Sequence, residues 1–487
     1  MAESVLVESY FREQTLVKQH LASYNKFIEF GMQDVIDRVK FIDPNVEGYQ
    51  LKLGKIRIEK PTIVEADGSR RQIIPMEARL RNLTYAAPVF LQISTLVHGV
   101  ERGGETEVFI GELPVMLKSR LCHLDNMTRE ELIETNEDPD DPGGYFIING
   151  SERVLVSIED LAPNRIMVSK EKDGQIITSK VFSTRYGFRA RCAIEKKKDG
   201  NMGVVFPASP KDLGLVSVLR ALGLERDEEI LAAFSDLLEV RNDMLLNLET
   251  DLSKSTAGAF ESIGKKAAPG QAKDYQKRRA EILLDTYLLP HIGTTPDDRK
   301  AKAYYLCRMT EKCVRVSYRL ASQDDKDHYM NKRIKLTGNL MEELFRYAFQ
   351  FLAKDVAYQV ERATARGRRL MVQTIVRPDA LSERIRYSMA TGNWIAGQQG
   401  VSQLLDRTNY LSTVSHLRRI ISPLSRKHPH FKARDLHGSH WGKLCPNESP
   451  EGPSCALVKN MALLCEISTG EDEKAVEQLL AKLNVSI

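Results

Sequence analysis

The sequence lacks the stretches that would place a chain in or across a membrane. No run of 18 apolar residues occurs among its 487 residues, whereas a membrane-spanning helix needs roughly 18 or more. The first residues, MAESVLVESYFREQ, carry Glu3 and Glu8 where a secretory signal needs basic and then apolar side chains. We therefore expect a cytoplasmic protein with no membrane attachment.

Cysteine is scarce and unpaired in the sequence. An odd number of cysteines without a CxxC pair excludes both a regular disulfide framework and a zinc ribbon. We expect reduced thiols that are mostly packed inside the protein. The seven cysteines stand at positions 122, 192, 307, 313, 445, 455 and 465.

A phosphate-binding P-loop is also missing. The nearest approach runs from Gly258 to Lys266, where five residues instead of four separate Gly258 from Gly264. Lys266 stands where a hydroxyl should reach magnesium. The sequence therefore offers no nucleotide-binding loop of this kind.

What is present is the composition of a large globular protein. Hydrophobic residues make up 42%, charged residues 28% and aromatic residues 7% of the chain, which excludes disordered and fibrous classes. At about 150 residues per domain the length predicts about three domains.

The positive charge is concentrated in one segment. Between Arg362 and Arg434 the chain has fourteen Lys and Arg residues and only three acidic residues, Asp379, Glu383 and Asp406. The net charge of this segment is therefore +11, and that of the rest of the chain is −7. Such a segment attracts polyanions and steers their approach. A solvated basic surface is the alternative that the charge count leaves open.

Periodicity in the sequence predicts a mixed α+β, multidomain protein. Strands are expected over 49–64 and 76–97, with a hairpin turn at Asp67-Gly68, and on both sides of the turn at 142–144. Residues 252–273 are expected to form a surface loop, and the chain after Val372 is basic, turn-rich and without clear periodicity. Helices are expected over 8–39 with a break at Gly31, over 210–248, 275–289 and 296–321, and from a cap at Thr337 to a stop at Gly367.

Two groups of side chains have the chemistry of metal ligands. Asp324, Asp325 and Asp327 could hold a divalent cation, although neighbouring Lys and Arg residues offer them ion pairs instead. A histidine group follows, near Cys445, with a poor spacing for structural zinc. Its members can equally pack inside the fold or contact nucleic acid; they are His428, His430, His437 and His440.

The segment GVSQLLDRTNYLSTVSHLRR, residues 400–419, has the character of a binding surface. Arg407, Arg418 and Arg419 can clamp phosphates with their planar guanidinium groups. Gln403, Asn409 and Ser415 can donate to sugar and phosphate oxygens without choosing a base. A merely soluble polar helix and turn is the alternative.

Six motifs occur along the chain: LPVMLKSRLCHL (113–124), DPGGYFIINGSERVLVSIE (141–159), DDKDHYMNKRIKLTG (324–338), MATGNW (389–394), GVSQLLDRTNYLSTVSHLRR (400–419) and HGSHWGKLCPNESPEGPSCALVKNMAL (437–463). In sequence and order these motifs resemble the second-largest subunit of multisubunit DNA-dependent RNA polymerases, and the archaeal and eukaryotic enzymes more than the bacterial ones. Because a full subunit of this family is more than twice as long, the chain resembles the N-terminal fragment of that subunit, which some archaea encode as two separate chains.

The resemblance implies a division into three named domains. A protrusion of helices and β-sheet is expected from residues 1–163 and 326–393, with a lobe, residues 164–325, inserted between its two parts. A fork domain and C-terminal tail are expected over 394–487.

The resemblance also implies a function shared among several chains. The catalytic Mg²⁺ of the family is held by an aspartate triad of the largest subunit, and no DxDxD occurs in this sequence. We therefore expect a polymerase subunit that is inactive alone, binds no metal, and contributes walls and loops to the active-centre cleft. Its expected partners are the C-terminal half of the split second-largest subunit, the largest and remaining subunits, general transcription factors, the DNA template and the RNA–DNA hybrid.

Residues expected to line nucleic acid follow from the same motifs. The loop from Ser422 to Phe431 resembles the fork's second loop, and Glu448 and Glu451 are expected to orient basic side chains rather than touch phosphate. The full expected set is Gln403, Arg407, Asn409, His416, Arg418, Arg419, Arg426, Lys427, Arg434, Glu448 and Glu451.

Two other functions remain open from the residues alone. A stand-alone protein that binds single-stranded nucleic acid would need aromatic stacking platforms. The basic segment has few, namely Tyr387, Trp394, Tyr410 and Phe431. A zinc or magnesium hydrolase would rest on the histidine and aspartate groups described above.

Overall fold

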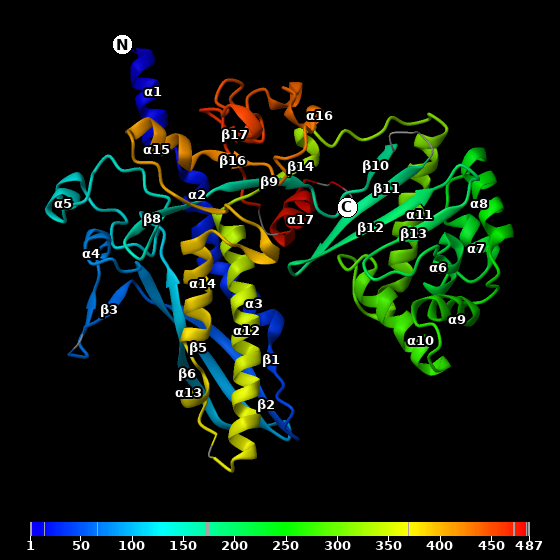
Figure 1. Ribbon diagram of the computed structural model, residues 1–487, viewed down its shortest axis with the longest axis horizontal. Coiled ribbons are helices and arrows are strands. Elements are labelled where there is room, and N and C mark those ends of the chain that lie inside the picture. The colour runs from blue at the N-terminus through cyan, green and yellow to red at the C-terminus, as the bar shows by residue number, and fades with distance from the viewer. Residues whose placement is uncertain are drawn as a thin grey trace. The chain divides into compact units, whose positions relative to one another are not determined.

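The computed structural model describes residues 2–13, 15–65, 67–170, 176–368, 370–470, 473–483 and 485. The chain forms two compact units (Figure 1). Unit 1 comprises residues 1–160 and 334–487, and unit 2 comprises residues 161–333. Unit 2 is thus an insertion in the sequence of unit 1. The division into protrusion, lobe and fork stays a prediction.

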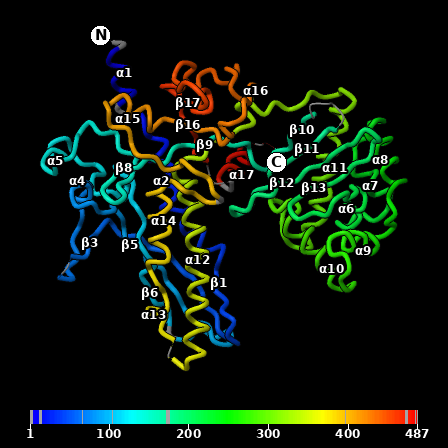
Figure 2. The backbone as a smooth tube through the Cα atoms, in the orientation of Figure 1, coloured from blue at the N-terminus to red at the C-terminus, as the bar shows by residue number. Residues whose placement is uncertain are grey.

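Unit 1 is built around an antiparallel sheet in the order β1–β2–β5–β6 with a helical layer on it. Figure 2 shows α12 and α14 running side by side along this sheet. The elements of its first part are α1 (Ala2–Glu13), α2 (Lys18–Lys26), a π-helical turn (Phe27–Gly31), α3 (Met32–Val39), β1 (Phe41–Ile42), β2 (Tyr49–Ile58), β3 (Thr62–Val64), β4 (Arg70–Gln72), α4 (Pro75–Leu80), β5 (Ala86–Val97), β6 (Val100–Pro114), α5 (Arg129–Glu134), β7 (Phe146–Ile148), β8 (Ser151–Leu155) and β9 (Ser157–Leu161).

Helix α12 supplies the largest apolar stripe of this core. It spans Thr337–Ala365, and its buried side chains recur every three or four residues, from Leu340 through Phe345 to Val360. That spacing places them on one helix face, which buries against the sheet. Gly367, with a φ of 64°, ends the helix in the left-handed conformation that glycine adopts without strain.

Strands β8 and β9 join the two parts of unit 1. β8 pairs with β15 (Ser402–Leu404), and β9 pairs in parallel with β16 (Arg419–Ile421), which in turn pairs with β17 (Val458–Asn460). Helix α15 (Tyr410–Leu417) lies between β15 and β16 in the sequence. Both ends of the 400–421 segment are therefore fixed to neighbouring strands. The other elements of this part are β14 (Lys332–Lys335), α13 (Val372–Ile375), α14 (Asp379–Thr391), α16 (Phe431–Arg434), α17 (Glu473–Lys482) and 3-10 turns at 395–397, 438–440 and 452–454.

Unit 2 packs helices against one face of a four-stranded antiparallel sheet in the order β10–β11–β12–β13. The strands are β10 (Met167–Lys170), β11 (Ile177–Arg185), β12 (Phe188–Lys196) and β13 (Met202–Val205). The helices are α6 (Leu215–Ala221), α7 (Asp227–Ala232), α8 (Leu238–Thr250), α9 (Thr256–Ala267), α10 (Lys273–Ile282) and α11 (Arg299–Ser317), with a π-helical turn at 283–287 and 3-10 turns at 296–298 and 329–331.

The structure confirms the mixed α+β, multidomain class and most predicted elements, and it corrects several. The expected surface loop at 252–273 is wrong, because Ser255 caps α9 and the helix buries Phe260 and Ile263. Gly31 is not a break, since the π-helical turn passes through it into α3. The chain after Val372 was expected to lack clear periodicity, but it contains the regular helix α14.

Further corrections concern strand ends and caps. The strand expected from residue 76 begins only at Ala86, because Pro75 starts the short helix α4. The turn at 142–144 precedes β7 but follows no strand directly. Thr337 is the first residue of α12 and not its cap, and its hydroxyl contacts His20 Nδ1 at 2.6 Å.

No helix in the described part of the chain is long and apolar enough to cross a membrane.

Candidate nucleic-acid interface

A polar cavity of about 600 Å³ opens in unit 1 beside β15, α15, β16 and β17. It gathers several predicted residues with side chains from the SPEG motif. Its walls are Gln403, Ser415, Arg419, Ile421, Arg426, Asn447, Glu448, Ser449, Pro450, Ser454, Val458, Lys459 and Asn460. We call this cavity the fork pocket.

His416 holds Gln403 at the pocket wall. The buried imidazole accepts a hydrogen bond at Nδ1 from the backbone N–H of Asp406, at 3.1 Å. Its other nitrogen, Nε2, must then carry the proton and donate it to Gln403 Oε1, 3.0 Å away. Burial, aided by the charge of Arg419, lowers the pKa of His416 to about 4. His416 therefore supports the pocket as a neutral, oriented side chain.

Arg419 and Arg426 are the pocket's available cations. Both line the cavity, and for neither side chain is a hydrogen-bond or ion-pair partner found within the described part of the chain. Lys427 is exposed beside Arg426 and its ammonium is likewise without a partner there. These three predicted residues can meet a phosphate without first breaking an internal contact.

Arg407 has a different environment from the predicted phosphate clamp. Its guanidinium donates to Glu152 through Nε at 2.6 Å and to Asp141 at 2.7 Å, and it lies over the Tyr145 ring, 4.9 Å from the centroid. Two of its nitrogens and one face of its guanidinium are thus engaged by the chain itself. The geometry favours a structural role for Arg407, outside the fork pocket.

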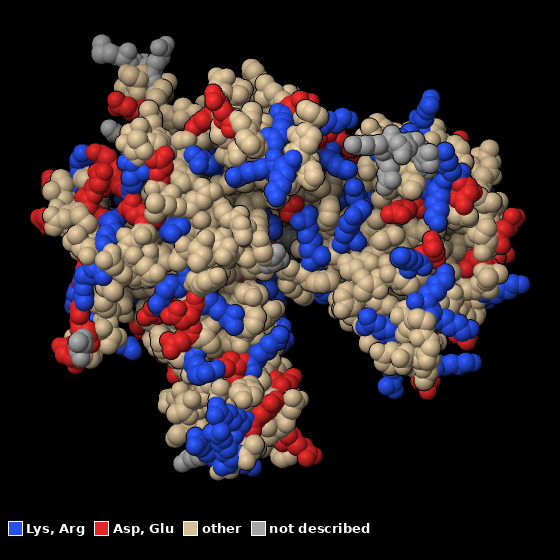
Figure 3. Space-filling model, in the orientation of Figure 1, with Lys and Arg blue, Asp and Glu red and all other residues tan. Residues whose placement is uncertain are grey.

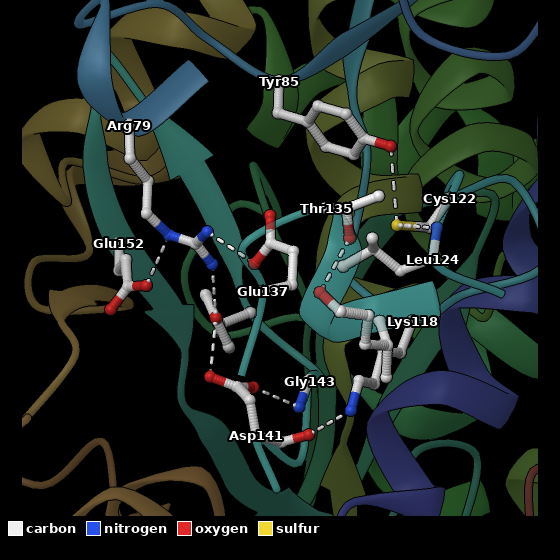
Figure 4. A network of polar contacts seen from close by, with 12 residues as sticks. Arg79, Tyr85, Lys118, Cys122, Leu124, Thr135, Glu137, Asp141, Gly143 and Glu152 are labelled. Carbon is white, nitrogen blue, oxygen red and sulfur yellow. Dashed lines mark hydrogen bonds and ion pairs between the residues drawn. The ribbon is translucent and has the colours of Figure 1, made fainter. Parts of the chain in front are cut away.

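The carboxylates that hold Arg407 belong to a larger polar network (Figure 4). Arg79 lies between Glu137 and Glu152, with nitrogen–oxygen distances of 2.8 and 2.9 Å. Its remaining nitrogen donates to the Tyr145 hydroxyl at 2.9 Å, and that hydroxyl donates to Asp141. Through this network, the loop that precedes β7 is attached both to strand β8 and to the start of the 407–419 segment.

Three more predicted residues are used inside the chain. Arg418 is only 6% exposed and donates to the backbone carbonyls of Leu16 and Ala462, both at 2.7 Å. Arg434 donates to three backbone carbonyls, of Pro429, Pro453 and Cys455. Asn409 caps α15 by accepting from the Ser412 backbone N–H at 2.8 Å. None of the three lines the fork pocket.

Glu448 and Glu451 differ in their contacts. Glu448 lines the pocket and accepts a hydrogen bond from the Ser415 hydroxyl. The exposed Glu451 carboxylate finds no partner in the described part of the chain. Glu448 is therefore oriented by this chain, whereas the described residues show no orienting contact for Glu451.

Lys459, Glu159 and Asn460 are site residues that the sequence did not indicate. Lys459 forms a buried ion pair with Glu159, with distances of 2.9 and 3.0 Å. Asn460 donates to the backbone oxygen and the hydroxyl of Ser415 at 3.1 and 3.0 Å. Strand alternation over three residues of β17 is too short a pattern to reveal them.

The basic segment separates into internal and surface residues. Besides Arg407, Arg418 and Arg434, the chain engages Arg377 with Asp355 and Arg386 with Glu383. Figure 3 shows Lys and Arg side chains gathered near the end of α12 and over the region of α16 and β16. Exposed members without a partner in the described part of the chain are Arg362, Arg366, Arg368, Arg426, Lys427 and Lys432.

The candidate metal ligands do not assemble in the structure. No group of three His, Cys, Asp or Glu side chains that could hold a metal occurs among the described residues. Asp324 pairs with Lys312 at 2.7 Å and accepts from the Val168 backbone N–H.

An apolar groove of about 1010 Å³ lies next to the fork pocket. Leu411, Leu436 and Trp441 line it and are 77%, 71% and 92% exposed. Leu463, also 60% exposed, forms part of the same wall. Such a large exposed apolar surface is typical of a protein interface.

Comparison with known proteins decides the family. The family described as "RNA polymerase beta subunit" matches residues 15–383, and "RNA polymerase Rpb2, domain 3" matches residues 403–467. This chain belongs to the second-largest subunits of DNA-directed RNA polymerase. The resemblance inferred from the six motifs is confirmed, and with it the predicted enzyme class.

Three relatives show how far the likeness extends. Subunit Rpo2N of the DNA-directed RNA polymerase of Methanocaldococcus jannaschii is 50% identical, with 99% of each chain covered. Rpo2N of Methanococcus vannielii is 49% identical over all of this chain and 99% of the relative. Subunit Rpo2 of Saccharolobus shibatae is 48% identical over 99% of this chain but only 43% of its own length. The chain is thus similar to the split archaeal form of this RNA polymerase subunit.

Proposed function

We propose that this chain forms a non-catalytic part of an RNA polymerase active centre and that it binds nucleic acid through the fork pocket. Arg419 and Arg426 carry the proposal, because they face the cavity without internal partners in the described part of the chain. The Gln403 amide accepts from His416 and donates one N–H to the Gly400 carbonyl at 3.0 Å, so its second N–H is the donor it adds for sugar or phosphate oxygens. The near-complete match to Rpo2N relatives supports a role in transcription rather than as a stand-alone binding protein.

The proposed mechanism assigns binding and orientation to this chain. The two guanidinium groups neutralise phosphate charge, and Glu448, held by Ser415, keeps the facing wall in register. Arg407 and the carboxylates around it hold the start of the 407–419 segment in place. In this proposal the magnesium that would support nucleotidyl transfer is held by the largest subunit, as the family resemblance implies.

The apolar groove is proposed as the site of the C-terminal half of the split second-largest subunit. The undivided Rpo2 relative is more than twice the length matched here, so a chain of that kind supplies a partner of suitable size. Covering Trp441 and Leu463 would remove a large apolar surface from water. Replacement of Trp441 with Gln should weaken co-purification of the two halves. Unchanged recovery of the complex would contradict this assignment.

We further propose that the assembled enzyme acts in the cytoplasm with the remaining subunits and general transcription factors. DNA template and RNA–DNA hybrid are its proposed nucleic-acid ligands.

The test of the fork pocket uses Arg419→Gln in the assembled polymerase. Loss of one phosphate contact should weaken binding of a template–RNA scaffold and lower the slope of log K against log salt by about 1. Arg278→Gln, at an exposed arginine of α10, is the matched control and should leave the slope unchanged. An unaltered slope in Arg419→Gln would overturn the assignment.

A further inference from the structure

Helix α12 has a second face, turned away from its buried stripe, that carries aromatic side chains at the surface. Tyr347, Phe351 and Tyr358 follow one another at intervals of four and seven residues, which places them on one side of the helix. Tyr347 and Tyr358 are 37% and 56% exposed, and Phe351 is partly buried. Lys354 and Arg362 are exposed on the same side. We call these five residues the outer face of α12.

Helix α14 borders this face and adds to it. The guanidinium carbon of Arg384 lies over the Phe351 ring, 3.6 Å from the centroid. Arg377, just before α14, pairs with Asp355, so the two helices run antiparallel and side by side (Figure 2). Three residues after Arg384, Tyr387 is 60% exposed. The Phe351 ring is thus used to position Arg384, whereas Tyr387 stays at the surface.

Local folding does not account for the exposed tyrosines of these two helices. A tyrosine at an exposed helix position has a lower helix propensity than Ala, Lys or Glu, and it removes little apolar surface from water. The side chains of Tyr358 and Tyr387 have no hydrogen bond or ring contact within the described part of the chain. Tyrosine and arginine are among the side chains that carry most of the binding energy in protein interfaces. Their exposure here therefore indicates a surface that a partner covers.

The charge on this surface is positive. Lys354, Arg362 and Arg384 form no ion pair within the described part of the chain. The carboxylates of α12 do not compensate them, because each is engaged elsewhere in the chain. A partner that covers these cations must therefore bring negative charge. The engaged carboxylates are Glu342 with Arg346, Glu343 with Lys335, Asp355 with Arg377, and Glu361, which accepts from the Asn45 backbone N–H.

The spacing of the exposed rings favours a helical partner over nucleic acid. Tyr347 and Tyr358 are eleven residues apart, which is about 16 Å along a helix, whereas successive nucleotides of a stacked strand are about 3.4 Å apart. The rings therefore cannot form a continuous stack with neighbouring bases. From Tyr347 through Phe351 and Lys354 to Tyr358 the steps are four, three and four residues. This is the spacing at which one helix packs along another.

We propose that the outer face of α12, together with Arg384 and Tyr387, binds an acidic amphipathic helix of a partner protein. Apolar side chains of that helix pack on the tyrosine rings, and its carboxylates meet the three cations. None of these residues lines the fork pocket or the apolar groove. The proposal is therefore separate from the proposed function.

The test uses the full-length chain and a fluorescein-labelled peptide of three heptads, with Leu at positions a and d, Glu at e and g, and Ala elsewhere. Fluorescence anisotropy measures the affinity. Tyr358→Gln should weaken binding about 5- to 10-fold, because it removes an exposed ring without touching the core. Arg362→Glu should weaken it to a similar extent. A p-benzoylphenylalanine at the central d position should cross-link to residues 347–362 or 384–387.

The matched controls are Tyr304→Gln, at a 52% exposed tyrosine of α11, and Arg278→Glu, and both should leave the affinity unchanged. Arg419→Gln should also leave it unchanged, which separates this result from that of the fork pocket. A peptide with Lys in place of Glu should bind at least about 10-fold more weakly.

The proposal is overturned if the Glu peptide does not bind, if Tyr358→Gln keeps the wild-type affinity, or if the Lys peptide binds equally well. Cross-links confined to the apolar groove would overturn it too. If Tyr358→Gln instead abolishes binding of a 20-base-pair DNA duplex or dimerisation of the chain, while peptide binding stays unchanged, the face belongs to nucleic acid or to a second copy.

Discussion

The Nε2 atom of His416 lies 3.0 Å from the side-chain oxygen of Gln403, so a buried imidazole fixes an amide at the rim of a polar cavity. The backbone N–H of Asp406 determines which nitrogen is protonated. The polar wall of the cavity therefore depends on a side chain that does not line the cavity itself.

His416 should make stability depend on pH. Its pKa falls from an ordinary 6.5 to about 4 because burial disfavours the charged ring. The unfolded chain then binds more protons between these values, so stability falls as the pH drops from 6.5 to 4, by at most roughly 3 kcal/mol from this group. Urea unfolding at pH 7.5, 6 and 5 measures the loss. His416→Asn, which can still accept from Asp406, should show a smaller loss, and an equal loss in both proteins would contradict the account.

Arg407 should affect folding rather than nucleic-acid binding. Replacement by Gln leaves Asp141 without its cation and Glu152 with Arg79 alone, and we expect a loss of about 1–3 kcal/mol in the free energy of unfolding. The salt slope of scaffold binding in the assembled enzyme should stay at the wild-type value. Arg419→Gln is the control, because it should lower the salt slope and leave the free energy of unfolding nearly unchanged. A reduced salt slope in Arg407→Gln would show that this arginine does contact phosphate.

Arg426 and Lys427 should contribute phosphate contacts together. Both are exposed in the loop that resembles the fork's second loop, and replacing both with Gln should lower the salt slope by up to about 2 without changing sequence preference. Filter binding of duplex and forked DNA over a salt series measures the slope. If it stays unchanged, the loop is a solvated surface.

Glu451 should act through a charged partner outside this chain. Its carboxylate is exposed and finds no partner in the part of the chain described here. Glu451→Gln keeps the shape, so we expect normal assembly with an altered elongation rate or fidelity. Glu448→Gln is the matched control in the same motif, since its hydrogen bond comes from Ser415. Wild-type elongation and fidelity in Glu451→Gln would leave this residue with no active-centre role.

Local patterns predicted the long elements well and the internal contacts of arginines poorly. Helix α12 was predictable because its apolar residues repeat with the helical period over many turns. Helix α9 was missed because its Ser, Ala, Gly and Lys content is typical of a loop, and only tertiary packing of Phe260 and Ile263 reveals its buried face.

The roles within the predicted site could not be separated from the sequence. Arg407 and Arg419 look alike in the motif, but Arg407 meets Glu152, 255 residues earlier in the chain. No local spacing reports a contact over that distance. The sequence identified the segment and its chemistry, whereas β-strand pairing with β8 and β9 decides which side chains face the cavity.

Extension of an RNA primer on a DNA template with Mg²⁺ tests the central claim most directly. Three samples are compared: this chain alone, the remaining polymerase subunits alone, and all subunits together. Because the described residues of this chain offer no metal site but supply the fork pocket, only the complete assembly should extend the primer at the full rate. Robust extension by this chain alone, or full activity without it, would contradict the account.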